Sequence, residues 1–151
     1  MSRTGFYTHP DCQRHDMGRG HPECPERLSA IRDRLLTTGV DHGLVEHEAP
    51  LAQEEDLLLA HDPHLVEAVS QLNREIQNEA AQGGHALMHI DPDTAMCEHS
   101  YNAAMRAVGA RVDSERLGRL TDPRRADSDR FFGACGNHPP VRVGDTPVWC
   151  V

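Results

Sequence analysis

The sequence contains no lysine, and all 15 of its basic residues are arginines. They are outnumbered by 24 acidic residues, which gives the chain a net charge of −9. A general nucleic-acid-binding protein needs a basic face, and this composition does not supply one. Aromatic residues make up only 4% of the chain, so few large side chains are available to fill a hydrophobic core.

Long apolar runs are also missing. No run approaches the roughly 18 residues that a membrane-spanning helix needs, and residues 1–5 (MSRTG) do not have the character of a signal peptide. The 5 cysteines are odd in number and form no Cys-x-x-Cys pair. We therefore expect neither a disulfide scaffold nor a structural zinc knuckle, and the predicted compartment is the cytoplasm.

Charge is distributed unevenly along the chain. Residues 1–110 carry 18 acidic residues and 8 arginines, whereas residues 111–151 carry 6 acidic residues and 7 arginines. The second segment also contains four prolines and shows no sustained helical or strand period. We predict a boundary near Ala110. After it we expect a tail that is disordered, diverged or translated from a shifted reading frame.

Strand-like and helix-like segments alternate over the first 110 residues. Strands are predicted at 3–9 and 43–48, and helices at 25–39 and 54–60. A longer helix begins at Pro63, and its apolar positions share one face: Leu65, Val66, Val69, Leu72 and Ile76. A last helix is expected from Tyr101 to an end at Gly109. This alternation predicts an α/β fold with parallel strands and flanking helices.

Three segments concentrate histidines and acids. The loop at 9–27 joins a strand to a helix, where ligands bind in α/β sheets, although residue types alone favour a stiff proline loop with solvated histidines. The pair His61-x-x-His64 could share a metal ion, as could His85 and His89, but Asp62-Pro63 favours a capped helix start with an exposed pair. The carboxylates of residues 89–94 could bind a ligand or simply precede a helix. The common zinc-protease, hydrolase, Walker and dinucleotide motifs are absent.

Two stretches resemble the histone deacetylase superfamily. Residues 6–11 (FYTHPD) and 15–28 (HDMGRGHPECPERL) are similar to the start of its bacterial class II members, which stand beside acetylpolyamine amidohydrolases and acetoin-utilisation proteins. Residues 91–94 (DPDT) and 101–110 match a second family stretch in the right order. The resemblance covers residues 4–110. It implies the N-terminal, incomplete part of an arginase/deacetylase fold, a parallel sheet with helices on both faces.

The resemblance implies zinc-dependent hydrolysis of an acetyl amide, with acetylated lysine or polyamines as substrates. In the family, a metal-bound water attacks the amide, paired histidines transfer protons and a tyrosine stabilises the oxyanion. The histidine pair and the zinc ligands belong to family segments after the helix that ends near Ala110, and the present sequence carries none of them there. We therefore expect a truncated family member with no catalytic residue, no bound zinc and no hydrolysis.

What the resemblance assigns to this chain is substrate binding. Arg27 matches an arginine that lines the channel below the metal, and Asp93 matches an acidic rim residue that holds the substrate backbone. His21 and Pro22 lie in a loop that matches a wall of the pocket. One alternative is a non-enzymatic interaction or regulatory module that binds a partner through these loops, and a weaker one is a histidine-rich metal-binding protein. Cutting the family's sheet would leave an open edge, so self-association is also predicted, with no nucleic acid or membrane as partner.

Overall fold

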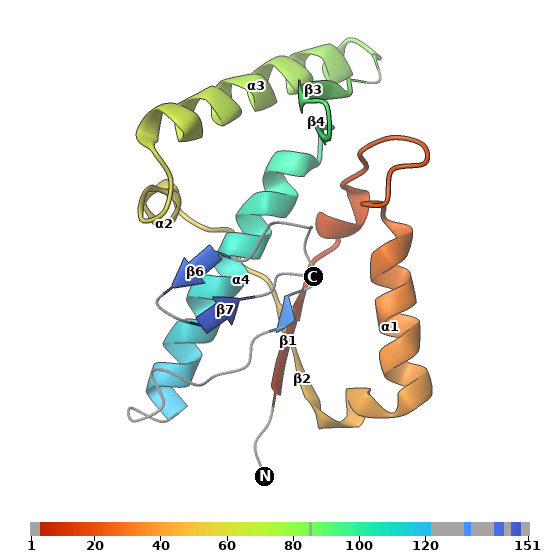
Figure 1. Ribbon diagram of the computed structural model, residues 1–151, viewed down its shortest axis with the longest axis vertical. Coiled ribbons are helices and arrows are strands. Elements are labelled where there is room, and N and C mark those ends of the chain that lie inside the picture. The colour runs from red at the N-terminus through yellow and green to blue at the C-terminus, as the bar shows by residue number, and fades with distance from the viewer. Residues whose placement is uncertain (1–3, 85, 122–131, 134–140, 144–145, 149–151) are drawn as a thin grey trace.

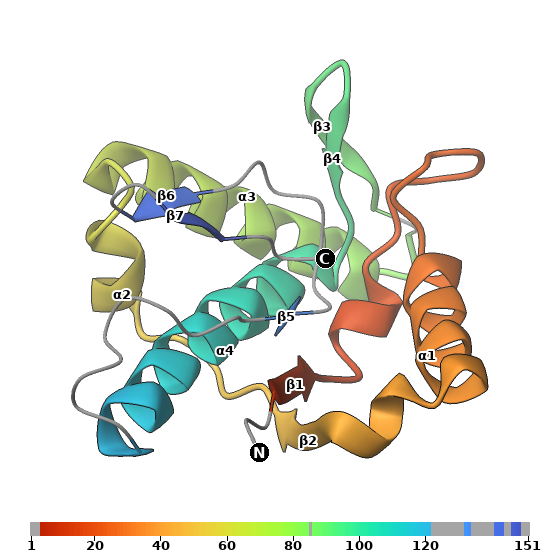
Figure 2. The ribbon, with the colours of Figure 1, turned by 60° about the horizontal axis from the view of Figure 1, so that its bottom comes forward.

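The computed structural model describes residues 4–84, 86–121, 132–133, 141–143 and 146–148 (Figure 1). Strand β1 (Thr4–Thr8) and strand β2 (Leu44–Glu48) pair in parallel, from Thr4 opposite Leu44 to Thr8 opposite Glu48. Strand β5 (Phe132–Gly133) pairs with the other edge of β1, giving the order β2-β1-β5. Figures 1 and 2 both show β1 and β2 lying between helices α1 and α4. The predicted parallel strands with flanking helices are confirmed.

The first helix has the boundaries that its proline and glycine predict. Helix α1 (Glu26–Thr38) begins after Pro25, whose fixed φ suits the first turn of a helix. Gly39 ends it in the left-handed conformation, at φ 70°, and its N–H reaches the carbonyls of Leu35 and Leu36. The short 3-10 segment η2 (Val40–Gly43) then leads the chain into β2.

Two further helices follow β2. Helix α2 (Glu54–Leu58) begins with a capping box in which Gln53 and Asp56 exchange side-chain and backbone hydrogen bonds. Helix α3 (Pro63–Ala81) is capped by Asp62, whose carboxylate accepts the His64 N–H at 2.8 Å. The apolar face predicted for this helix is only partly covered, since Val66 and Ile76 are buried while Leu65 is 52% exposed.

The last helix runs past its predicted end at Gly109. Helix α4 (Ser100–Thr121) passes through Gly109 and Ala110 without a break, so residues 111–121 are helical and Gly109 is not a helix end. Gly109 is needed for a different reason. A Cβ there would overlap the Pro50 carbonyl oxygen and lie 2.8 Å from the Ala52 nitrogen. The helix therefore touches the backbone that follows β2. Beyond Thr121 much of the predicted tail lies outside the described residues, which there include β5, β6 (Val141–Val143) and β7 (Thr146–Val148).

The acidic segment ahead of α4 also differs from its prediction. Strands β3 (Met88–Asp91) and β4 (Thr94–Met96) form an antiparallel hairpin, with Pro92 and Asp93 between them. These residues are therefore a hairpin turn rather than the lead-in to a helix. Figure 2 shows the hairpin projecting from the body of the molecule on the same side as the loop between β1 and α1.

The hydrophobic core is small because many of its buried side chains are alanines. Tyr7 is 2% exposed and packs with Ala49 and Ala110, while its hydroxyl donates to Asp113 Oδ2 at 2.9 Å. The Tyr7 ring also stacks on His47, with 4.8 Å between the ring centroids. None of the helices in the described part of the chain is both long and apolar enough to cross a membrane.

Candidate functional site

The loop between β1 and α1 begins with charged side chains at the carboxyl ends of β1 and β2. His9 Nδ1 lies 3.0 Å from Asp11 Oδ2, and His9 Nε2 lies 3.4 Å from Glu48 Oε1. Arg106, on α4, places Nε 3.2 Å from Asp11 Oδ2 and donates to the Ala49 carbonyl at 2.8 Å. These contacts tie both strand ends to α4. His9 and Asp11 therefore stabilise the packing of the strands on α4. The interpretation of this segment as a plain proline loop predicted a solvated His9, and that prediction is wrong.

The same loop then reaches the start of α4, where four side chains meet. His15 Nδ1 lies 2.7 Å from Ser100 Oγ, and His15 Nε2 lies 3.6 Å from Glu23 Oε1. Ser100 Oγ accepts the Cys97 N–H at 2.8 Å and donates to Cys97 Sγ at 3.4 Å. The Asp16 N–H donates to the same sulfur at 3.5 Å. Glu23, His15, Ser100 and Cys97 thus form one chain of contacts, the thiol cluster.

The thiol cluster favours a thiolate facing an imidazolium. Burial is the largest single influence on Cys97 and raises its pKa, but the nearby His15 ring, the Ser100 hydroxyl and two backbone N–H groups together outweigh it and lower the pKa to about 6. The proximity of the Cys97 thiol, and then of the Glu23 carboxylate, raises the pKa of His15 to about 9. Between these two values both groups are charged, and each stabilises the charge on the other.

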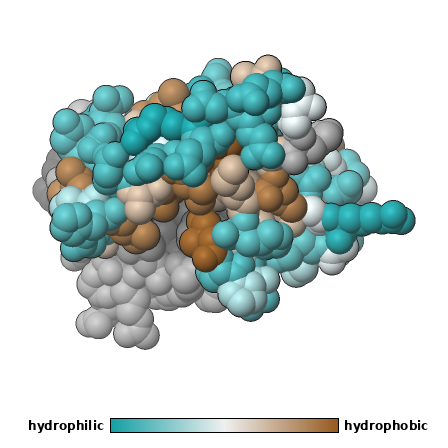
Figure 3. All heavy atoms as spheres, turned by 90° about the horizontal axis from the view of Figure 1, so that it is seen from above, coloured by the Kyte–Doolittle hydropathy of each residue, from teal (hydrophilic) through white to brown (hydrophobic). Residues whose placement is uncertain are grey.

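Cys97 also forms part of the wall of an open cleft of about 250 Å³. Asp16 and Gly18 line it from the loop, and Ala86 and Leu87 line it from the segment ahead of β3. Figures 1 and 2 agree that this loop and the β3–β4 hairpin lie side by side. Seen from above in Figure 3, the surface is largely polar with apolar side chains showing between the polar ones. The thiol is therefore reachable from solvent through a partly apolar cleft.

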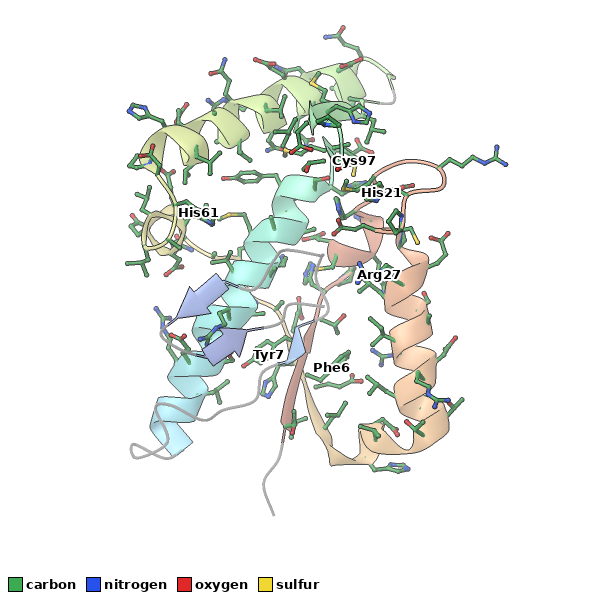
Figure 4. All side chains as sticks on the ribbon, in the orientation of Figure 1. Phe6, Tyr7, His21, Arg27, His61 and Cys97 are labelled. Carbon is green, nitrogen blue, oxygen red and sulfur yellow. The ribbon has the colours of Figure 1, made fainter. Side chains whose placement is uncertain are left out.

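The channel and pocket-wall residues predicted from the resemblance lie near the thiol cluster. Arg27, in the first turn of α1, lines a cavity of about 10 Å³ together with His15 and Glu23. That is room for about one water molecule. His21 Nδ1 accepts the Glu23 N–H at 3.0 Å, and Pro22 is exposed. Figure 4 places Cys97, His21 and Arg27 on the same side of α4.

Asp93 lies apart from these residues, at the exposed turn of the β3–β4 hairpin. Its N–H donates to Asp91 Oδ1 at 2.8 Å, which helps to close the turn. The pKa of the exposed Asp91 carboxyl is lowered, chiefly by this hydrogen bond and by one from the Thr94 side chain. The substrate-binding roles of Asp93, Arg27, His21 and Pro22 stay predictions.

The histidine pairs give no metal site in the described part of the chain. His61 and His64 are exposed around the start of α3, and Figure 4 shows His61 beyond the other side of α4 from Cys97. His89 is exposed on β3, while His85 lies outside the described residues. Over residues 4–84 and 86–121, no three His, Cys, Asp or Glu side chains are grouped so that they could hold a metal ion. These residues do not fit the zinc ion that the resemblance implies.

Sequence reasoning missed Cys97 and Ser100. The available signal was a cysteine three residues before a serine at a helix start, where hydroxyl and backbone N–H groups can stabilise a thiolate. Cys97 and Cys24 are free thiols. Cys12 takes part in a disulfide bond, contrary to the expectation that the cysteines are reduced.

Comparison with known proteins identifies the fold and the family. The family model described as "Histone deacetylase domain" matches residues 21–118. Among solved structures, the crystal structure of the HDA15 HD domain is similar, with a TM-score of 0.68 and 24% sequence identity. The match covers 92% of this chain and 36% of that chain, so the present chain spans about a third of that relative. No curated protein sequence matches the chain.

Proposed function

Because this chain belongs to the histone deacetylase family, we propose that it forms the N-terminal part of a deacetylase-type domain and does not hydrolyse acetyl amides by itself. The observation that carries the proposal is the family match over residues 21–118, which takes in the end of the β1–α1 loop, the hairpin and most of α4. These are the parts to which the resemblance gives substrate-binding roles. The histidine pair and zinc ligands of the family belong to later segments, which the sequence after Ala110 does not reproduce.

The substrate class that we propose for the complete domain is an acetylated lysine or an acetylated polyamine, with zinc as the metal. In this chain His21 and Pro22 would contribute a pocket wall, Arg27 would line the channel below the metal, and Asp93 would contribute the rim. The hairpin that carries Asp93 lies beside the β1–α1 loop, which supports a wall and a rim on two sides of one opening. When bound, zinc would activate water and polarise the amide carbonyl. The residues described here would bind and orient the substrate.

An assay on the purified 151-residue chain tests this proposal. We expect no turnover of an acetyl-lysine peptide or of an acetylated polyamine, with or without added zinc. A full-length family deacetylase assayed in parallel shows that the substrates and the metal are competent. Turnover by the chain that requires stoichiometric zinc and disappears with a chelator would contradict the proposal.

A second candidate function is a non-enzymatic interaction module, and the exposed surface favours it. In the sheet order β2-β1-β5, strand β2 lies at an edge, where backbone N–H and C=O groups can pair with another chain. Large apolar side chains are exposed nearby in the sequence, including Leu51 at 48% and Leu59 at 84%. We propose that self-association uses these features, with no nucleic acid or membrane as partner.

We propose the cytoplasm of a bacterium as the compartment, because the β1–α1 loop resembles that of bacterial family members. A reducing cytoplasm would open the disulfide at Cys12. Trapping free thiols at the moment of cell lysis tests the compartment. Recovery of Cys12 as a free thiol is the expected result, and its recovery as a disulfide would place the protein elsewhere.

A further inference from the structure

The thiol cluster has the connections of a proton relay. With Nε2 facing the Glu23 carboxylate, the protonated His15 ring directs its Nδ1–H toward Ser100 Oγ. That leaves the Ser100 hydroxyl hydrogen to point at Cys97 Sγ, as the 3.4 Å contact shows. Ser100 is 7% exposed, so water does not compete strongly for these bonds. The Cys97 thiol itself donates to the Arg14 carbonyl at 3.7 Å, so its proton must turn toward Ser100 before it passes to His15, and it can return by the same route.

The sulfur at the end of this relay faces a space that a small molecule can enter. The cleft of about 250 Å³ is many times the roughly 10–15 Å³ of free space that one water molecule needs. Ala86 and Leu87 give it an apolar wall, while the Asp16 carboxylate, which accepts the Gly18 N–H at 2.8 Å, makes it unfavourable for anions. A small uncharged molecule suits this combination best.

We propose that Cys97 is a nucleophile that captures small, uncharged α,β-unsaturated carbonyl compounds in this cleft, with Ser100 and His15 handling the proton. The thiolate attacks the β-carbon, so a C–S bond forms as the C=C π bond opens and its electrons move to the carbonyl as an enolate. The proton that the thiol gave to His15 returns to the α-carbon. The net reaction adds S–H across the double bond and needs no other reactant.

The expected rate follows from the charge state of the thiol. With a pKa of about 6, half of Cys97 is thiolate at pH 6, against roughly 0.3% of an ordinary cysteine of pKa about 8.5. A more acidic thiol is intrinsically less nucleophilic, by a factor of roughly 13 over this difference. Cys97 should therefore react about tenfold faster at pH 6 than an unstructured cysteine peptide.

In the part of the chain that the structure describes, the charged and titratable groups next to the Cys97 sulfur come from three segments. The loop supplies His15, Asp16 and Glu23, and the turn before α4 supplies His99, which lies 3.3 Å from Glu98. Helix α4 supplies the Ser100 hydroxyl and its N-terminal backbone. A shift in the reactivity of Cys97 between pH 5 and 9 must come from these groups.

The experiment uses the full chain and acrylamide as the electrophile, with mass spectrometry reading Cys97 and Cys24 separately from pH 5 to pH 9. We expect a half-maximal Cys97 rate near pH 6 and the tenfold advantage over the peptide at pH 6. A Cys97 rate that rises only above pH 8, in step with the peptide, overturns the proposal without any variant.

Two variants separate the relay from the cleft. His15→Asn should move the Cys97 midpoint upward by at least one pH unit, while His42→Asn, with a histidine side chain that is 87% exposed, should leave it unchanged. Ala86→Phe fills the cleft, so it should slow acrylamide addition severalfold at an unchanged midpoint. A cooperative thermal unfolding transition like that of the original protein shows that each variant is folded. If His15→Asn leaves the pH midpoint of Cys97 unchanged in a folded protein, the relay is refuted. If Ala86→Phe leaves the rate of acrylamide addition unchanged, the role of the cleft is refuted.

Discussion

Replacing Gly109 with alanine should destabilise the protein, although Gly109 lies inside a helix. Alanine is favoured over glycine in a helix interior by about 1 kcal/mol, so helix propensity alone predicts stabilisation. The added Cβ, however, would overlap the Pro50 carbonyl oxygen and lie 2.8 Å from both the Pro50 carbonyl carbon and the Ala52 nitrogen. These are backbone atoms, which cannot turn aside as the end of a flexible side chain can.

The structure shows what a shift of this backbone would cost. The Ala52 N–H donates to the Met105 carbonyl at 3.0 Å, and Arg106 donates to the Ala49 carbonyl at 2.8 Å, so the segment is fixed to α4 on both sides of the clash. Ala49 is 0% exposed, which leaves it no room to retreat. Overpacking typically costs about 1–3 kcal/mol, and a lost buried hydrogen bond about 1–3 kcal/mol more. Subtracting the helix term leaves a range of about 1–5 kcal/mol, and the middle of that range, about 2–4 kcal/mol, is the expected loss.

Chemical and thermal unfolding measure this loss. For a chain of this size, about 2–4 kcal/mol corresponds to a fall in Tm on the order of 10 °C. Gly43→Ala is the matched control, because a Cβ at Gly43 meets nothing within 4 Å, and its stability should stay within about 0.5 kcal/mol of the original. If Gly109→Ala proves as stable as the original protein, or more stable, the close approach of α4 to this backbone is wrong.

Two further perturbations test the packing and the sheet edge. Arg106→Met removes the ion pair with Asp11 and the hydrogen bond to Ala49, so it should lower the unfolding free energy by about 2–4 kcal/mol. The control Arg32→Met breaks an exposed ion pair and should cost under about 1 kcal/mol. Equal losses in the two variants would show that the Arg106 contacts are not formed. If the β2 edge self-associates, sedimentation and the unfolding midpoint should both depend on protein concentration, whereas a monomer with a concentration-independent transition would exclude association through that edge.

The sequence predicted the elements whose boundaries depend on local chemistry. Pro25 and Gly39 bound α1 because one has the φ of a helix start and the other takes a left-handed φ at its end. Asp62 caps α3 for a similarly local reason, through its own carboxylate. Parallel pairing of β1 and β2 followed from the alternation of strands and helices.

Predictions failed where a residue has two uses that look the same in a sequence. Glycine ends helices because it tolerates positive φ, but it also admits close packing because it lacks a Cβ. Gly109 does the second, and only the position of Pro50 distinguishes the two. The hairpin around Asp93 was missed because strands of 4 and 3 residues are too short to show a period of two. An acidic turn and an acidic helix start then look alike.

The thiol cluster was beyond sequence reasoning for a third reason, which is distance along the chain. His15 and Ser100 are 85 residues apart, and the loop brings them to 2.7 Å only after β1, α1 and α4 have packed. The family resemblance covered both segments, yet it directed attention to pocket-wall and rim positions and passed over the cysteine between the hairpin and the helix. Cys97 is singled out because the relay ends at its sulfur and the residue also lines the cleft. Either feature alone would describe an ordinary surface cysteine, whereas together they supply the proton route and the access that a nucleophile needs.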